Sequence, residues 1–162
     1  MKKFVVFLIV GLFASSAAWG ATITINATVT QKLSVDVDNN TWEITVNNDG
    51  AEIVNDPQGT LTVTSSKKNY TVTFSSLYNG ALSNGTETIP YLIKVNTAGW
   101  SGVETNNLIA YTQLTVAKTI VFDERTPVLG KTFDIGFKIA AYTEYYVDGA
   151  YTDTITISIA HP

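Results

Sequence analysis

The sequence contains no cysteine and only one histidine, His161, which is the residue before the last. Without thiols the chain forms no disulfides, thiolate metal sites or cysteine-based active sites. A single histidine so near a chain end, where chains commonly fray, is a poor basis for a Ser-His-Asp triad or a His-ligated metal. No other catalytic constellation is found, so we expect a protein that is not an enzyme and needs no cofactor.

Basic clusters and helical periodicity are also lacking. The 14 acidic residues outnumber the 10 basic ones, and the formal net charge is −4. A surface of this sign does not suit nucleic acid or anionic lipid. The acidic turns at 36–40 and 47–50 lack the spacing and closing glutamate of a known calcium loop. Ordinary turn chemistry explains them, and calcium binding there stays an open question.

The first twenty residues have the three parts of a secretory signal peptide. A positive start, an apolar stretch and a small-residue segment follow one another at Lys2–Lys3, 4–13 and 14–20. The apolar stretch is shorter than the ~20 residues that span a bilayer as a helix. We expect cleavage after Gly20 or Ala21, which makes the mature chain a secreted or cell-surface protein without a membrane span. Losing two lysines changes its net charge to −6.

The rest of the chain alternates apolar and polar residues in short segments between turn signals. The strands predicted from this pattern cover residues 33–37, 42–46, 59–65, 69–76, 89–95, 114–122, 133–139 and 154–159. Residues 96–107 are expected to be loop, and residues 108–113 stay ambiguous. Eight or nine strands with one apolar face each predict an all-β, antiparallel, immunoglobulin-like sandwich over residues 32–162.

The start of the mature chain has more alternation than one domain needs. The apolar residues of one parity are Ile23, Ile25, Ala27 and Val29, then Leu33, Val35 and Val37. One strand of that length would span about 50 Å at ~3.3 Å per residue, whereas strands usually run ~3–10 residues. Gln31 breaks the pattern, so residues 21–31 are a candidate separate strand. That strand either completes another molecule or bends back into its own sandwich, because both arrangements require the same alternation.

Exposed aromatic residues are the candidates for a ligand surface. Trp100 lies in a glycine-flanked loop, and Tyr145 and Tyr146 lie in a short connection. Aromatic rings in loops can stack on sugar rings. The alternative for Trp100 is that it folds back and closes one end of the sandwich.

The closing stretch "GAYTDTITISI", residues 149–159, resembles the end of the spore coat protein U domain. Gly149, Tyr151 and Asp153 match the residues that introduce the last strand of that family, and Ile155 and Ile157 match the strand. The family includes subunits of archaic chaperone–usher pili. This chain departs from it in having no cysteine and in ending with Ala-His-Pro.

The resemblance implies an incomplete, pilin-like sandwich that the N-terminal segment of the next subunit completes. Ile23, Ile25, Ala27 and Val29 would then be the donor-strand contacts, and Gln31 would stand at the junction. The implied function is that of a structural subunit of an extracellular filament or coat, a fimbria-like homopolymer built by donor-strand exchange. The implied helpers are a periplasmic chaperone and an outer-membrane usher. The alternative is a monomeric secreted carbohydrate-binding or adhesin module.

Overall fold

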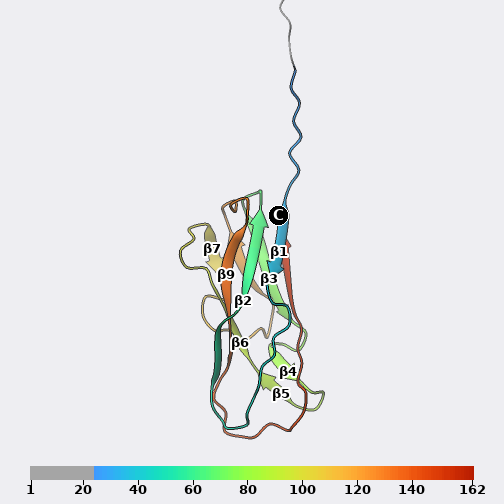
Figure 1. Cartoon of the computed structure of the whole chain (residues 1–162), viewed down its shortest axis with the longest axis vertical. Coiled ribbons are helices and arrows are strands. Elements are labelled where there is room, and N and C mark those ends of the chain that lie inside the picture. The colour runs from blue at the N-terminus through green and yellow to red at the C-terminus, as the bar shows by residue number, and fades with distance from the viewer. Residues whose placement is uncertain (1–23) are drawn as a thin grey trace, which may run out of the picture.

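The computed structural model describes residues 24–162, and these residues contain ten strands and no helix (Figure 1). The signal peptide and Ile23 lie outside the described residues. The strands are β1 (Leu33–Val37), β2 (Ile53–Ser65), β3 (Tyr70–Ser76), β4 (Ala81–Ser83), β5 (Thr88–Pro90), β6 (Leu92–Asn96), β7 (Val103–Asn106), β8 (Lys118–Phe122), β9 (Lys131–Ile139) and β10 (Ile155–Ala160).

Two four-stranded antiparallel sheets make up the body. Their strand orders are β1-β2-β9-β6 and β10-β3-β8-β7, and β4 and β5 form a separate hairpin. The buried residues of both sheets form one hydrophobic cluster between them, as expected of a β-sandwich. The prediction of an all-β antiparallel fold is therefore confirmed, with ten strands in place of eight or nine.

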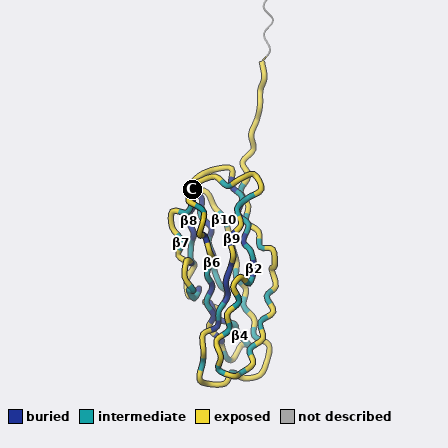
Figure 2. Tube along the Cα trace, turned by 60° about the vertical axis from the view of Figure 1, so that its left-hand side comes forward, coloured by how far each residue is buried: buried dark blue, intermediate teal, exposed yellow. Residues whose placement is uncertain are grey.

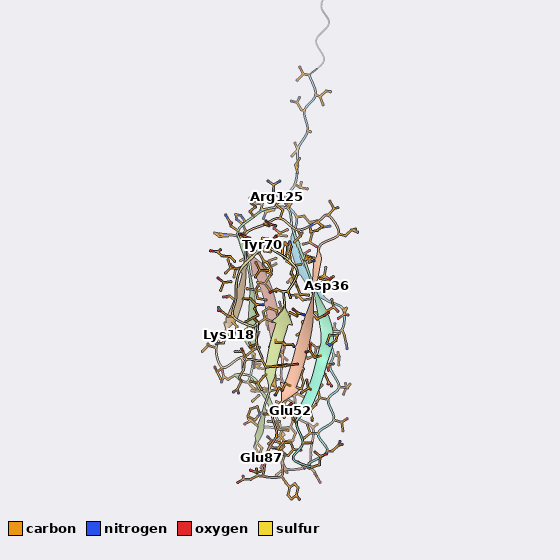
Figure 3. The ribbon with its side chains drawn as sticks, turned by 90° about the vertical axis from the view of Figure 1, so that its left-hand side faces the viewer. Asp36, Glu52, Tyr70, Glu87, Lys118 and Arg125 are labelled. Carbon is orange, nitrogen blue, oxygen red and sulfur yellow. The ribbon has the colours of Figure 1, made fainter. Side chains whose placement is uncertain are left out.

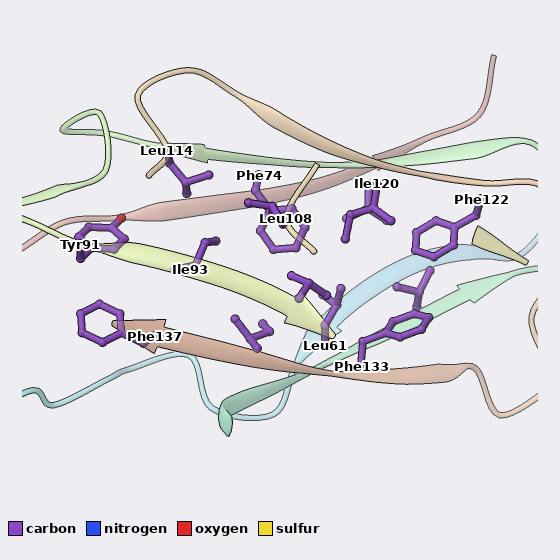
Figure 4. Packing of buried hydrophobic residues seen from close by; sticks show 14 of the residues in the cluster. Leu61, Phe74, Tyr91, Ile93, Leu108, Leu114, Ile120, Phe122, Phe133 and Phe137 are labelled. Carbon is purple, nitrogen blue, oxygen red and sulfur yellow. The ribbon is translucent and has the colours of Figure 1, made fainter. Parts of the chain in front are cut away.

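The core follows from the alternation of the sequence, because every second residue of a strand faces inward. Along β3 the residues alternate between buried and half-buried, and Tyr70, Val72 and Phe74 are fully buried. Aromatic rings strengthen the packing (Figure 4). Phe122 lies 5.0 Å from the ring of Tyr70 and 5.7 Å from that of Phe133. Figure 2 shows the buried residues along the strands and exposed residues along the loops at both ends.

Five predicted boundaries are wrong. The predicted strand 59–65 begins already at Ile53, because residues 53–55 also pair with β9. Residues 42–46 are extended but belong to no strand, because no neighbouring strand pairs with them. The predicted strand 89–95 is divided at Tyr91, because residues before it pair with β4 and residues after it pair with β9. The predicted strand 114–122 begins only at Lys118, where pairing with β3 starts. The predicted loop 96–107 contains β7, whose polar sequence gives no alternation signal.

The two ends of the sandwich are built from different connections (Figure 3). The turn 66–69 joins β2 to β3 at one end, and Thr126 is tied to that end by its N–H, which donates to the Ser65 carbonyl (3.1 Å). Residues 24–31, called the extension below, leave the body there, so we call this the extension end (Figure 1). At the other end, which we call the tyrosine end, Tyr142 N–H donates to the Gly50 carbonyl (3.2 Å). It consists of residues 47–50, 84–87 and 141–149.

Candidate binding groove

One lateral edge of the sandwich is formed by β1 from one sheet and β10 from the other, and we call it the open edge. Leu33 lies opposite Ser65 and Ala160 lies opposite Thr71, so β1 begins and β10 ends at the extension end. The two strands are therefore antiparallel to one another. No ladder of hydrogen bonds joins them.

Backbone hydrogen-bonding groups of β1 and β10 point into this edge. In an antiparallel pair, alternate residues bond to the partner strand and the others turn their N–H and C=O outward. Ser66 N–H donates to the Lys32 carbonyl, so the even-numbered residues of β1 bond to β2. Leu77 N–H likewise donates to the Thr154 carbonyl, so the even-numbered residues of β10 bond to β3. The odd-numbered residues turn outward, and nothing between residues 24 and 162 continues either sheet beyond them.

A groove of about 450 Å³ runs along the open edge. Its apolar lining comes from six strands and from three residues outside any strand: Val35, Val37, Trp42, Ile44, Phe74, Leu82, Tyr91, Ile93, Ile135, Phe137, Ile155 and Ile157. Its polar lining is Asp36, Asn39, Asn40, Asp153 and Thr154. Neither Leu33 nor Ile159 lines it, so the groove occupies the part of the edge nearer the tyrosine end.

The core-facing side chains of the open edge are only half-buried. Leu33, Val35 and Val37 of β1 have this intermediate exposure, and so do Ile155 and Ile157 of β10. The corresponding residues in the middle of each sheet are at most 3% exposed. Apolar surface left in this state favours a partner that covers it. The outward N–H and C=O groups specify what kind of partner fits, namely an extended strand.

Asp153, from the motif that introduces β10, fixes the floor of the groove. One carboxylate oxygen accepts from the hydroxyls of Ser76 (2.6 Å) and Tyr91 (2.5 Å). The other accepts from the backbone N–H of Tyr78 (3.0 Å) and of Thr154 (2.7 Å). Burial and the hydrogen bond to Asp153 raise the pKa of Tyr91, so its hydroxyl stays protonated and donates. One aspartate therefore holds the start of β10 to β3 and to the residue before β6.

The other residues of that motif position the connection into β10. The Tyr151 hydroxyl lies 3.0 Å from Glu87 Oε2 and 2.9 Å from the Val147 carbonyl, and it has one proton to share between them. Burial, followed by the bond to Glu87, raises the pKa of Tyr151. Gly149 has a φ of 156°, a backbone angle that residues with a side chain rarely adopt. Ile155 and Ile157 follow as half-buried residues lining the groove.

The candidate donor residues lie away from this groove. Ile25 is 86% exposed and Val29 is 90% exposed, and Ala27 is exposed as well. Residues 24–31 belong to no strand and lead away from the body (Figure 1). Ile23 lies outside the described residues. Within residues 24–162, the groove of the chain is not occupied by its own extension.

The candidate ligand aromatics are at opposite ends and do not form one site. Trp100 folds back on the extension end, with its ring 5.3 Å from Phe122 and 5.5 Å from Phe133. At the tyrosine end the ring of Tyr146 packs at a tilt against that of Tyr142, with 4.8 Å between the ring centres, and Tyr145 there is 84% exposed. The packing of Trp100 agrees with the alternative that it closes one end of the sandwich.

Of the residues that line the groove, only Asp153, Ile155 and Ile157 were named from the sequence as site residues, and those that were missed include Trp42, Ile44, Leu82 and Tyr91. Trp42 and Ile44 belong to an alternating apolar pattern that the sequence does show. Both side chains pack on the core, and the ring centre of Trp42 lies 6.2 Å from that of Phe137. Leu82 and Tyr91 are brought to the groove by the β4–β5 hairpin, which depends on pairing that no local pattern reveals.

No protein-family model matches the chain, and no curated protein matches it either. The resemblance to the spore coat protein U domain therefore stays a prediction. Among residues 24–162 no helix is long and apolar enough to cross a membrane. Within the same residues no three His, Cys, Asp or Glu side chains are grouped so as to hold a metal ion.

Proposed function

We propose that the chain is a structural subunit of an extracellular filament or coat, in which the extension of one copy fills the groove of the next. The observation that carries the proposal is a groove with an apolar floor, whose two walls, β1 and β10, turn unpaired backbone groups outward. The same chain has an exposed extension with alternating apolar residues. A strand added there bonds to β1 and β10 together and covers the half-buried side chains between them.

The side chains of the extension suit the groove. Its apolar residues share one parity, so in an extended strand they all face the floor. Thr and Asn occupy the other parity and would face solvent. Burying Ile25 and Val29 contributes about 1.5–3 kcal/mol for each side chain. The extension is uncharged from Ala21 to Thr30, so no ionised side chain is buried with it.

The length of the groove determines how much of the extension it accepts directly. From Asp153 to Ile157 the wall of β10 measures about 13 Å at ~3.3 Å per residue, which accommodates two or three side chains of one parity. Full insertion from Ile23 to Val29 then requires β1 and β10 to separate near Leu33 and Ile159, where no hydrogen-bond ladder holds them together. Family resemblance and geometry support the same arrangement.

The direct test uses the mature chain, a version lacking Ala21–Thr30, and a synthetic peptide of residues 22–30. We expect the mature chain to polymerise and the shortened chain to stay monomeric and capture the peptide, as measured by size-exclusion chromatography and fluorescence anisotropy. A peptide with Ile23→Asp and Ile25→Asp is the matched control and should not bind, because its charges would enter an apolar groove. Negative-stain microscopy of the mature chain should show filaments.

A monomeric carbohydrate-binding or adhesin module is the second candidate. It is favoured by the exposed Tyr145 beside a small hollow of about 150 Å³ that also involves Tyr142, Asp49 and Glu144. An intact mature chain that stays monomeric and ignores the peptide would rule out the filament and favour this candidate. Binding to immobilised polysaccharides, lost on Tyr145→Ala, would then be the measurement to make.

A further inference from the structure

The two ends of the sandwich carry opposite charge. The basic residues of the extension end are Lys32, Lys67, Lys68, Arg125 and Lys131, against the three acids Glu104, Asp123 and Glu124. The connections 38–51, 77–91 and 140–153, which lead to and form the tyrosine end, contain seven acidic residues and no lysine or arginine. Figure 3 places Arg125 and Glu87 at these two extremes.

The remaining lysines of the described residues do not change this separation of charge between the two ends. Lys94 forms an ion pair with Asp56, and Lys138 forms one with Glu52. The first pair joins β6 to β2 in the body of the first sheet. The second lies where β2 begins and β9 ends, beside the tyrosine end, and it adds no net charge there. Lys118 starts β8 opposite Phe74, in the body of the other sheet.

Each end also exposes apolar side chains. At the extension end Val128 is 88% exposed and Leu129 is 93% exposed. At the tyrosine end Tyr145 is 84% exposed and Val147 is 56% exposed. Single exposed apolar residues are ordinary. Here exposed apolar residues lie close together at both ends, and the two ends also carry opposite charge. This combination favours contact between the extension end of one copy and the tyrosine end of another.

The connection between extension and body is short. Lys32 is already tied to the extension end, because its N–H donates to Ser66 Oγ (2.9 Å) and its carbonyl accepts from Ser66 N–H (2.8 Å). Three residue steps separate it from Val29, which is at most about 11 Å of chain. A copy whose Val29 sits in a neighbour's groove therefore has its extension end within about one Debye length, ~10 Å at 0.1 M salt, of that neighbour.

The position of the groove determines which end of the neighbour the extension end of the donating copy reaches. The groove lies toward the tyrosine end, and a strand entering from there runs antiparallel to β10 and parallel to β1. We propose that the basic extension end of one copy docks on the acidic tyrosine end of the next, as a second interface between copies. This inference rests on the proposed function and names the surface that would accompany strand exchange.

Such an interface has a defined consequence for assembly. The surfaces in contact are different on the two copies, so the contact repeats head to tail and gives an open filament with a direction. Opposite charges at the two poles steer each incoming copy into alignment before its extension finds the groove. Steering of this kind raises association rates by about 10- to 10³-fold and is lost at high salt.

The test separates docking of the ends from filling of the groove. Residues 22–30 carry no charge, so capture of that peptide should change less than about twofold between low and high salt. Elongation of the full mature chain, followed by light scattering, should slow by at least about tenfold over the same range. Lys67→Glu with Lys68→Glu should slow elongation at low salt, and so should Glu144→Lys with Asp148→Lys. A chain with all four changes should regain much of the rate.

Lys68→Glu alone should also slow elongation at low salt. Lys118→Glu is its matched control, because it makes the same change of charge in the body of the sheet. Far-ultraviolet circular dichroism and capture of the peptide should be unchanged in every variant, which excludes misfolding as the cause. Elongation that is indifferent to salt, or equal rates for Lys68→Glu and Lys118→Glu, would overturn docking of the ends and leave groove filling intact. Failure of the chain to capture the peptide would overturn both.

Discussion

The closed edge of the sandwich, formed by β6 and β7, differs from the open edge in having a segment that covers it. Leu108 is fully buried there, and its carbonyl accepts from Val95 N–H (2.7 Å). Thr112 exchanges both backbone hydrogen bonds with Ile93 (3.0 and 2.9 Å), and Asn106 Nδ2 donates to the Val95 carbonyl (2.9 Å). The outward backbone groups of β6 are thereby satisfied within the chain.

The open edge also alternates apolar and polar residues along its strands, but within residues 24–162 no such segment covers it. Its Val35, Val37, Ile155 and Ile157 match Ile93 and Val95 in kind, yet they are half-buried. The two edges therefore differ in whether another segment of the chain lies beside the outermost strand. Residues 106–114 cover one edge, whereas no segment within residues 24–162 pairs with the outer side of the other.

The largest expected effect compares a side chain that seals the closed edge with one that lines the open edge. Leu108→Ala should lower the free energy of unfolding by about 2–5 kcal/mol, because it empties a fully buried site. Val37→Ala removes two methyl groups from a half-buried site and should cost about 0.8 kcal/mol. Chemical denaturation of the chain lacking residues 21–30 measures both.

Adding the peptide of residues 22–30 sharpens this comparison. The cost of Val37→Ala should rise toward about 1.6 kcal/mol as the peptide covers the site, while the cost of Leu108→Ala stays unchanged. Equal costs for the two variants without peptide would show that the edges are equally closed.

The second expected effect concerns the anchor of β10 at the open edge. Asp153→Ala removes the acceptor of the Tyr91 hydroxyl and should cost about 1–3 kcal/mol of unfolding free energy, because a buried donor loses its partner. In a Tyr91→Phe background the cost should be smaller, because the hydroxyl is already absent. A double-mutant cycle by denaturation measures the coupling, and purely additive costs would contradict the assigned bond.

The third expected effect uses two buried tyrosines, one in the groove and one remote from it. Burial raises the pKa of Tyr91 and also that of Tyr70, which stacks on Phe122. Each therefore stays protonated in the folded chain above pH 10, where unfolded tyrosine ionises. Their stabilisation is complete below pH 10 and is lost as the pH rises toward the raised values, at about 1.4 kcal/mol per pH unit for each tyrosine.

Unfolding measured between pH 9 and pH 11.5 tests this dependence. Tyr70→Phe and Tyr91→Phe should each remove one tyrosine's share of the slope. At neutral pH the two should differ, because the Tyr70 hydroxyl has no hydrogen-bond partner within residues 24–162 and the Tyr91 hydroxyl has Asp153. Tyr91→Phe should cost about 1 kcal/mol, and Tyr70→Phe should not be destabilising. A slope that neither variant changes would show that other groups set it.

Much of the fold was predictable from residue alternation. The strands β1, β3, β9 and β10 lie within about two residues of their predicted limits, because each places its apolar residues on one face. Strand β7 was not predictable, because Val103–Asn106 pairs through its backbone and has little apolar periodicity. The groove was anticipated only through the resemblance, since its lining comes from segments far apart in the chain.

The sequence by itself determined an antiparallel all-β chain with one apolar face per strand, because a period of two residues can be read locally. It also determined that the extension is apolar on one side and uncharged. Only the tertiary structure decided which edge is sealed, where Asp153 is anchored and how charge is divided between the ends. Those features depend on which distant segments lie side by side, and that is a matter of strand order and packing that no local pattern contains.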